Sequence, residues 1–138
     1  MIVPSTGQFE GVARNAVVAW NGSREAAVAL HAALPALRRA SRVTLVSFRH
    51  PRDEEEDDRQ PSAADMLQFL SRHGIQATFE RNVTGIDVAD ALLSRVAELG
   101  AELLVMGGYG HSRLRELVLG GVTRQILAQM TVPVLTAH

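Results

Sequence analysis

Three glycines near the C-terminal end of the chain have the spacing of an anion-binding loop. Gly107 and Gly110 are separated by two residues, and Gly120 follows after nine more. Glycine tolerates positive φ and lets backbone N–H groups approach a phosphate closely. Gly120 and Gly121 also come directly before a predicted helix, whose first N–H groups are unpaired and carry the positive end of the helix dipole. The spacing predicts a phosphate site, although the same glycines are also typical of an ordinary turn between a strand and a helix.

The side chains around these glycines limit the chemistry of the predicted site. All fourteen basic residues are arginine, so the lysine of a P-loop is absent, and no G-x-G-x-x-G follows the first predicted strand. A phosphate would therefore be held by backbone amides, by the Thr123 hydroxyl and by an arginine such as Arg124. The chain has no cysteine, its five histidines lack metal-binding spacing, and Ser112 lacks the G-x-S-x-G context of a hydrolase. We expect no metal site and no catalytic residues.

The glycines need a scaffold, and the hydrophobic pattern indicates one in which strands and helices alternate. Short apolar runs predict five strands, and apolar positions at helical spacing predict four helices between them. The predicted strands are residues 15–20, 42–48, 75–81, 101–107 and 131–136. The predicted helices are residues 24–40 with a kink at Pro35, a helix capped by Ser62 that ends at Gly74, a helix between Gly85 and Gly100, and one around residues 122–130.

This alternation is typical of the α/β class. Helical crossovers between strands imply parallel pairing, so we predict a doubly wound five-stranded parallel sheet with helices on both faces, a Rossmann-like sandwich. In such folds a ligand binds beyond the carboxyl ends of the strands, at the switch in strand order. The turns that begin at Asn21, Arg49 and Gly107 would then face one crevice.

Length and composition predict a single domain. A chain of 138 residues suits one compact domain, which we place at residues 14–138 after a lead-in segment at residues 1–13. The net charge of −1 gives no field that would attract nucleic acid. No apolar run approaches the roughly 18 residues of a membrane span, and the N-terminus lacks the features of a signal peptide. We therefore expect a cytoplasmic protein that binds neither nucleic acid nor membrane, a location that the absence of cysteine also fits.

Four segments, in order along nearly the whole chain, carry a resemblance to a known family. The segment "MGGYGHSRLRELVLGGVTRQIL" resembles the C-terminal signature of the universal stress protein family, G-x2-G-x9-G-[S/T], with matching glycines in type and spacing. The segment "VVAWNGS" resembles the family's first strand and turn, and "VTGIDVADALLSRVAELGAELLVMG" its third turn, helix and fourth strand. The closing strand of the family is similar to "TVPVLT".

The resemblance implies a domain that binds an adenine nucleotide and acts in the stress response through dimerisation or a partner. The ligand would be ATP, with AMP or cAMP as alternatives, and any ATPase activity would be slow. The family's homodimers pair through the last strand. The matching positions here are Ala19, Trp20 and Asn21 for adenine and ribose, the Phe48 backbone for adenine, and Met106, Gly107, Gly110, Gly120, Gly121, Val122 and Thr123 for ribose and phosphates.

An alternative is a nucleotide-free interaction module of the same family. Asn21 stands where the family usually has Asp, and Gly121 where it usually has Ser or Thr, so one carboxylate and one hydroxyl are missing. Trp20 has two interpretations, since its ring could stack on adenine or simply pack at the end of a strand. The segment "MIVPS" resembles the end of a closing strand, which suggests the second copy of a tandem pair.

Overall fold

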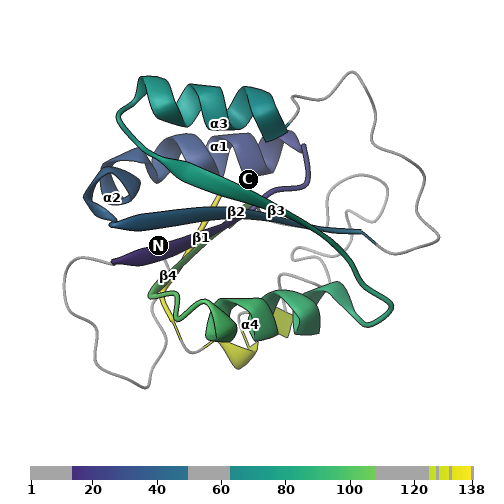
Figure 1. The fold of residues 1–138 in the computed structure, drawn as a ribbon. Helices are drawn as coiled ribbons and strands as arrows, with labels where there is room; N and C mark the ends of the chain where they lie inside the picture. Colours follow the sequence, from purple (N-terminus) through teal and green to yellow (C-terminus); the bar gives the residue numbers. More distant parts are fainter. Residues whose placement is uncertain (1–13, 50–62, 108–124, 127, 131, 138) are drawn as a thin grey trace.

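A computed structural model describes residues 14–49, 63–107, 125–126, 128–130 and 132–137 of the chain. Within these residues strands and helices alternate as the sequence predicts (Figure 1). The elements are β1 (Asn15–Ala19), α1 (Arg24–Ala32), α2 (Leu34–Arg39), β2 (Arg42–Arg49), α3 (Ala63–Arg72), β3 (Ala77–Val83), α4 (Val88–Glu98), β4 (Leu103–Gly107) and β5 (Val134–Ala137). Residues 125–126 and 128–129 are helical. In the part of the chain that the model covers, we find no helix with the length and apolar character of a membrane span.

The five strands form one parallel sheet in the order β3-β2-β1-β4-β5. Helices α1 and α3 cover one face of the sheet and α4 covers the other (Figure 1). The strand order reverses between β1 and β4, because the chain moves outward from β1 to β3 and then returns to the other side of β1. This arrangement confirms the predicted doubly wound fold and places the switch point between β1 and β4.

The predicted helix over residues 24–40 is two helices. The N–H of Ala33 donates to the carbonyls of Ala29 and Leu30 at 3.0 and 3.2 Å and ends α1. Pro35 then lies in the first turn of α2. Proline has no N–H to continue the ladder of α1, but it is well tolerated in a first helical turn. The predicted kink is therefore a full break.

Two strands begin two residues later than predicted, for a shared reason. Gly74 and Gly100 adopt positive φ angles of 77° and 64° at the ends of α3 and α4. The next residue in each case donates its N–H back into the helix, from Ile75 to Leu70 at 2.9 Å and from Ala101 to Val96 at 3.0 Å. These are the long bonds of the Schellman motif. The residues after each glycine are therefore used to close a helix, and β3 and β4 start after them.

The core has two parts, one on each face of the sheet. Alternate residues of a strand point to opposite faces, so each central strand contributes to both. The cluster under α1, α2 and α3 includes Val18, Leu30, Leu37, Leu45 and Leu70. The cluster under α4 includes Val17, Val46, Leu92, Leu104 and Met106. We call these surfaces of the sheet the α1 face and the α4 face.

Candidate functional site at the carboxyl edge of the sheet

The turn after β1 is built by its own polar groups. The Trp20 N–H donates to the Val46 carbonyl at 2.8 Å, which extends the pairing of β1 with β2 by one residue. The Asn21 Oδ1 then accepts the Ser23 N–H at 3.0 Å, and Gly22 between them has a φ of 76°. The Ser23 Oγ accepts the Ala26 N–H at 3.1 Å and caps α1. The first turn of α1 is thereby fixed beside the end of β1.

The end of β4 lies directly against this first turn of α1. A Cβ placed on Gly107 would lie 2.5 Å from the Ala26 nitrogen and 2.6 Å from the Glu25 carbonyl carbon, closer than real side chains approach a backbone. Gly107 is therefore required for close packing between β4 and α1. This contact joins the turn after β1 to the end of β4 at the switch point.

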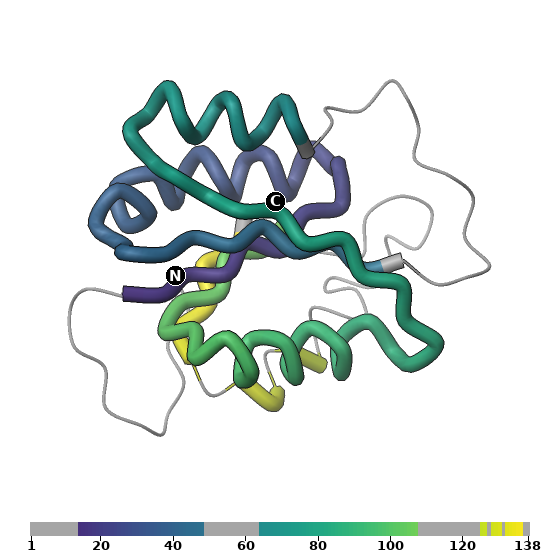
Figure 2. Tube along the Cα trace, viewed as in Figure 1, coloured from purple at the N-terminus to yellow at the C-terminus, as the bar shows by residue number. Residues whose placement is uncertain are grey.

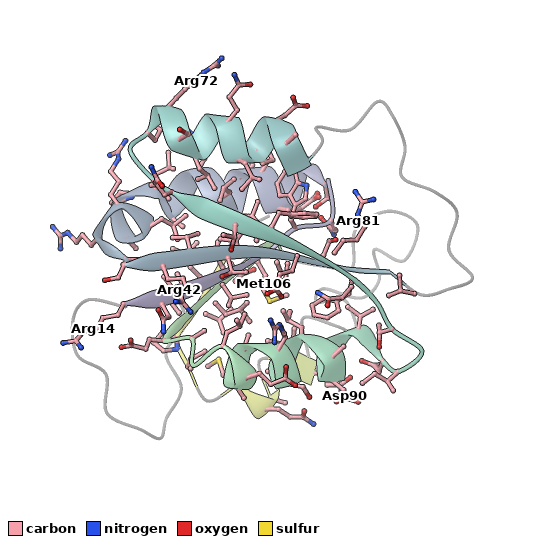
Figure 3. The ribbon with its side chains drawn as sticks, in the orientation of Figure 1. Arg14, Arg42, Arg72, Arg81, Asp90 and Met106 are labelled. Atoms are coloured by element: carbon pink, nitrogen blue, oxygen red, sulfur yellow. The ribbon has the colours of Figure 1, made fainter. Side chains whose placement is uncertain are left out.

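The side chains at the end of β1 point to different faces. The Trp20 side chain is buried in the core of the α1 face, where the residue is only 5% exposed. This position supports the interpretation of Trp20 as a packing residue, while its backbone still lies at the carboxyl edge. Ala19 and Met106 belong to the α4 face and are also buried. Figure 3 shows Met106 between the sheet and α4.

The end of β2 adds a further predicted residue to the same edge. Phe48 is partly buried and packs against the core of the α4 face. Its partner in register on β3 is Asn82, so both side chains point to that face. The Asn82 Nδ2 is buried and has no hydrogen-bond partner among the described residues. Asn82 was not among the predicted site residues, because the third predicted strand ended at Arg81. The sequence pattern that could have revealed it is the alternation of side chains between the two faces of the strand, which continues beyond Arg81.

Charged and polar contacts hold α4 and the segment after it in place. The Arg95 guanidinium donates to both carboxylate oxygens of Glu80, at 2.6 and 2.8 Å, and thus ties α4 to β3. These hydrogen bonds lower the pKa of the Glu80 carboxyl. The Asp87 Oδ1 accepts the Ala89 N–H at 2.8 Å and caps α4. The Gln125 amide donates to Asp90 at 2.8 Å, so residue 125 is attached to α4.

The model brings part of the predicted site together. Carboxyl ends of parallel strands share one edge, and the strand pairing aligns the ends of β1, β2 and β4 there. Figure 2 shows that α1 and α4 both begin on this side of the sheet. The predicted site residues at this edge are Ala19, Trp20, Asn21, Phe48, Met106 and Gly107. Gly110, Gly120, Gly121, Val122 and Thr123 lie outside the described residues. Within the described ranges, we find no group of three or more acidic or histidine side chains that could hold a metal ion.

A sequence model of the universal stress protein family matches residues 13–138 of the chain. The chain belongs to the universal stress protein family. A relative from Synechocystis, universal stress protein Slr1230, is 43% identical over 47 residues. That match covers 34% of this chain and only 16% of the length of the relative, so the properties of the whole relative do not transfer.

Solved structures of universal stress proteins share the fold. UspA from Lactobacillus plantarum superposes with a TM-score of 0.74 at 15% identity, covering 94% of this chain and all of that one. A universal stress protein in complex with cAMP gives a TM-score of 0.66 at 21% identity, over 93% of this chain and 99% of that one. The protein from Archaeoglobus fulgidus in complex with dAMP gives 0.61 at 18% identity, over 90% and 97% of the two chains. At these identities the similarity concerns the fold.

Proposed function

We propose that this domain binds an adenine nucleotide, with ATP as the preferred form, and serves the cytoplasmic stress response through dimerisation or a partner. The observation that carries the proposal is the meeting of β1, β2, β4 and the start of α1 at the switch point, where Gly107 packs against the α1 backbone. Open α/β sheets bind ligands at this place. Two relatives of the same fold are complexes with cAMP and dAMP, which supports an adenine nucleotide as the ligand class.

In this proposal the two sides of the switch point hold different parts of the nucleotide. The ends of β1 and β2 receive adenine and ribose, with the backbone of Phe48 beside the base and Asn21 beside the ribose. The glycine segment after β4 receives ribose and phosphates through Gly107, Gly110 and the helix start that the sequence predicts at residues 120–123. Backbone N–H groups can bind phosphate without a lysine. No nucleophile–base pair is evident in the sequence, so the role is binding, with slow ATP hydrolysis at most.

Calorimetric titration with ATP, AMP and cAMP tests the proposal directly. Binding of one nucleotide per chain, together with nucleotide released from the purified protein on denaturation, is the expected result. Gly121→Ser supplies the hydroxyl that the family usually has, and we expect it to tighten ATP binding severalfold. The absence of both heat and co-purified nucleotide at millimolar ATP would contradict nucleotide binding.

The proposed dimer uses β5. This strand pairs only with β4 in the described sheet and is therefore an edge. An unpaired edge presents N–H and C=O groups that a second copy can pair with. Light scattering during gel filtration distinguishes a dimer from a monomer of 14.9 kDa.

A second candidate is a nucleotide-free interaction module. The observation that favours it is that the turn after β1 satisfies its own groups, since the Asn21 oxygen already accepts the Ser23 N–H. Trp20 is likewise buried in the core. The titration separates the two candidates, because a dimer that binds no adenine nucleotide supports only the second.

A further inference from the structure

The Asn82 side chain has an amide nitrogen that the described fold leaves unpaired at the carboxyl edge. Asn82 is the last residue but one of β3, and its Nδ2 is buried without a hydrogen-bond partner among the described residues. A buried N–H donor that is left unpaired destabilises the folded protein, since it loses its bonds to water and gains none. An apolar side chain would avoid this cost. The position is therefore explained better by a binding partner than by folding.

The position of Asn82 in the sheet indicates what that partner is. Register pairs Asn82 with Phe48, and the α4 face carries both side chains. On the next strand, Ala19 pairs with Val46, which places Asn21 two residues further along the same edge. Asn82 thus extends the row formed by the ends of β1 and β2, on the side of the switch point away from the glycine segment after β4. In the proposed function this side receives the base.

The chemistry of the amide fits a base and does not favour a phosphate. The Nδ2 group is a neutral donor, whereas phosphate sites in proteins use arginine, lysine or clustered backbone N–H groups. The ring nitrogens of a purine are neutral acceptors. Thr136 Oγ1, which is also buried and unpaired, lies on β5 at the opposite edge of the sheet. The two groups are four strands apart, about 19 Å at the usual strand spacing, which is too far for one base to contact both.

We propose that Asn82 Nδ2 donates a hydrogen bond to a ring nitrogen of the bound purine and contributes to selectivity for the base. This assignment rests on the proposed nucleotide binding. It predicts that the amide stabilises the complex and destabilises the free protein, an opposition that a purely structural asparagine would not produce.

The first test compares Asn82→Leu with Thr78→Val. Leucine has nearly the shape of asparagine but no donor. We expect AMP to bind Asn82→Leu about 5-fold to 30-fold more weakly than the natural protein, while the ligand-free variant melts at the same temperature or higher. Thr78→Val removes a polar group from the same strand and face, four residues earlier and exposed, and should leave AMP binding unchanged. A lower melting temperature for Asn82→Leu would assign Asn82 a structural role and overturn the proposal.

The second test changes the ligand. Its first measurement uses only the natural protein, and its second repeats the titration with Asn82→Leu. The 1-deaza, 3-deaza and 7-deaza analogues of AMP each replace one ring nitrogen by C–H. We expect one analogue to bind the natural protein more weakly than AMP, and the same analogue to lose nothing further on Asn82→Leu. Equal AMP affinity in the natural protein and in Asn82→Leu would overturn the assignment of Asn82 alone. The absence of AMP, ATP and cAMP binding to the natural protein would overturn nucleotide binding and this assignment together.

Discussion

The two faces of the sheet are made from the same strands, yet they differ in the kind of residue that they bury. The α1 face is filled mainly by aliphatic side chains and Trp20, packed under three helices, and includes the half-buried Ser47 of β2. The α4 face contains a comparable aliphatic cluster but also the buried or half-buried polar residues Thr44, Glu80, Asn82 and Thr136. Both faces therefore hold the fold together, and among the described strand residues the α4 face carries more of the buried and half-buried polar groups.

This difference is significant because burial of polar groups carries a cost. Glu80 offsets it with its ion pair to Arg95. Asn82, two residues further along β3, has no such partner in the described structure. The polar groups of the α4 face thus change from paired to unpaired as the strand approaches the proposed base-binding edge. Substitutions on the two faces should accordingly separate stability from binding.

The largest expected effect is on the α1 face. Leu45 is fully buried in the centre of the sheet, so Leu45→Ala leaves a cavity and should lower the free energy of unfolding by about 2–5 kcal/mol. AMP affinity of the folded protein should not change, because Leu45 lies in the middle of β2 and not at the carboxyl edge where we propose that the nucleotide binds. Urea unfolding and calorimetry measure the two quantities. A loss of AMP affinity at a temperature where the variant is folded would break the distinction between the faces.

Gly107→Ala should affect both stability and binding. Its Cβ cannot fit against the backbone of Glu25 and Ala26, so α1 or β4 must shift. Overpacking of this kind costs about 1–3 kcal/mol. The shift also moves the start of α1 at the switch point, so we expect weaker AMP binding. Titration well below the melting temperature of the variant, where it is folded, measures this affinity. Unchanged stability would show that the contact between β4 and α1 is looser than the distances at Gly107 indicate.

Much of this architecture could be predicted from the sequence. The strand and helix alternation fixed the fold class, and Gly74 and Gly100 correctly marked two helix ends. The starts of β1 and β2 were predicted correctly, whereas β3 and β4 were predicted to start two residues too early, because Schellman bonds use residues after each glycine that are apolar like those of a strand. The spacing of the glycines predicted a phosphate-binding role for Gly107. Its close approach to α1 could not be predicted, because that contact depends on three-dimensional packing. Asn82 was missed because the third predicted strand ended at Arg81, and its pairing with Phe48 depends on strand register, which a single sequence does not reveal.

The helix caps provide a matched comparison of smaller size. Ser23 caps α1 at the switch point and Asp87 caps α4 on the other face, each through one side-chain oxygen. Ser23→Ala and Asp87→Ala should each lower the free energy of unfolding by about 1 kcal/mol. Only Ser23→Ala should weaken AMP binding, because the start of α1 adjoins the end of β4. Equal losses of affinity in both variants, measured by titration, would argue against a site centred on the switch point.

The smallest expected effect concerns the ion pair of the α4 face and depends on pH. Hydrogen bonds from Arg95 lower the folded-state pKa of Glu80 below its ordinary value of 4.5. The ionised carboxylate therefore stabilises the folded protein above that pH, and the contribution disappears as the pH falls through the lowered pKa. Glu80→Gln should be less stable than the natural protein at pH 7, by less than either cap variant, and the difference should shrink when the pH is lowered to a value below 4.5. Since Glu80 is already paired, AMP affinity at pH 7 should stay within twofold of the natural value, in contrast to Asn82→Leu. Unfolding curves at the two pH values test the stability of Glu80→Gln, and one titration tests its AMP affinity. If Glu80→Gln lost as much affinity as Asn82→Leu, the distinction between paired and unpaired polar groups on this face would not hold.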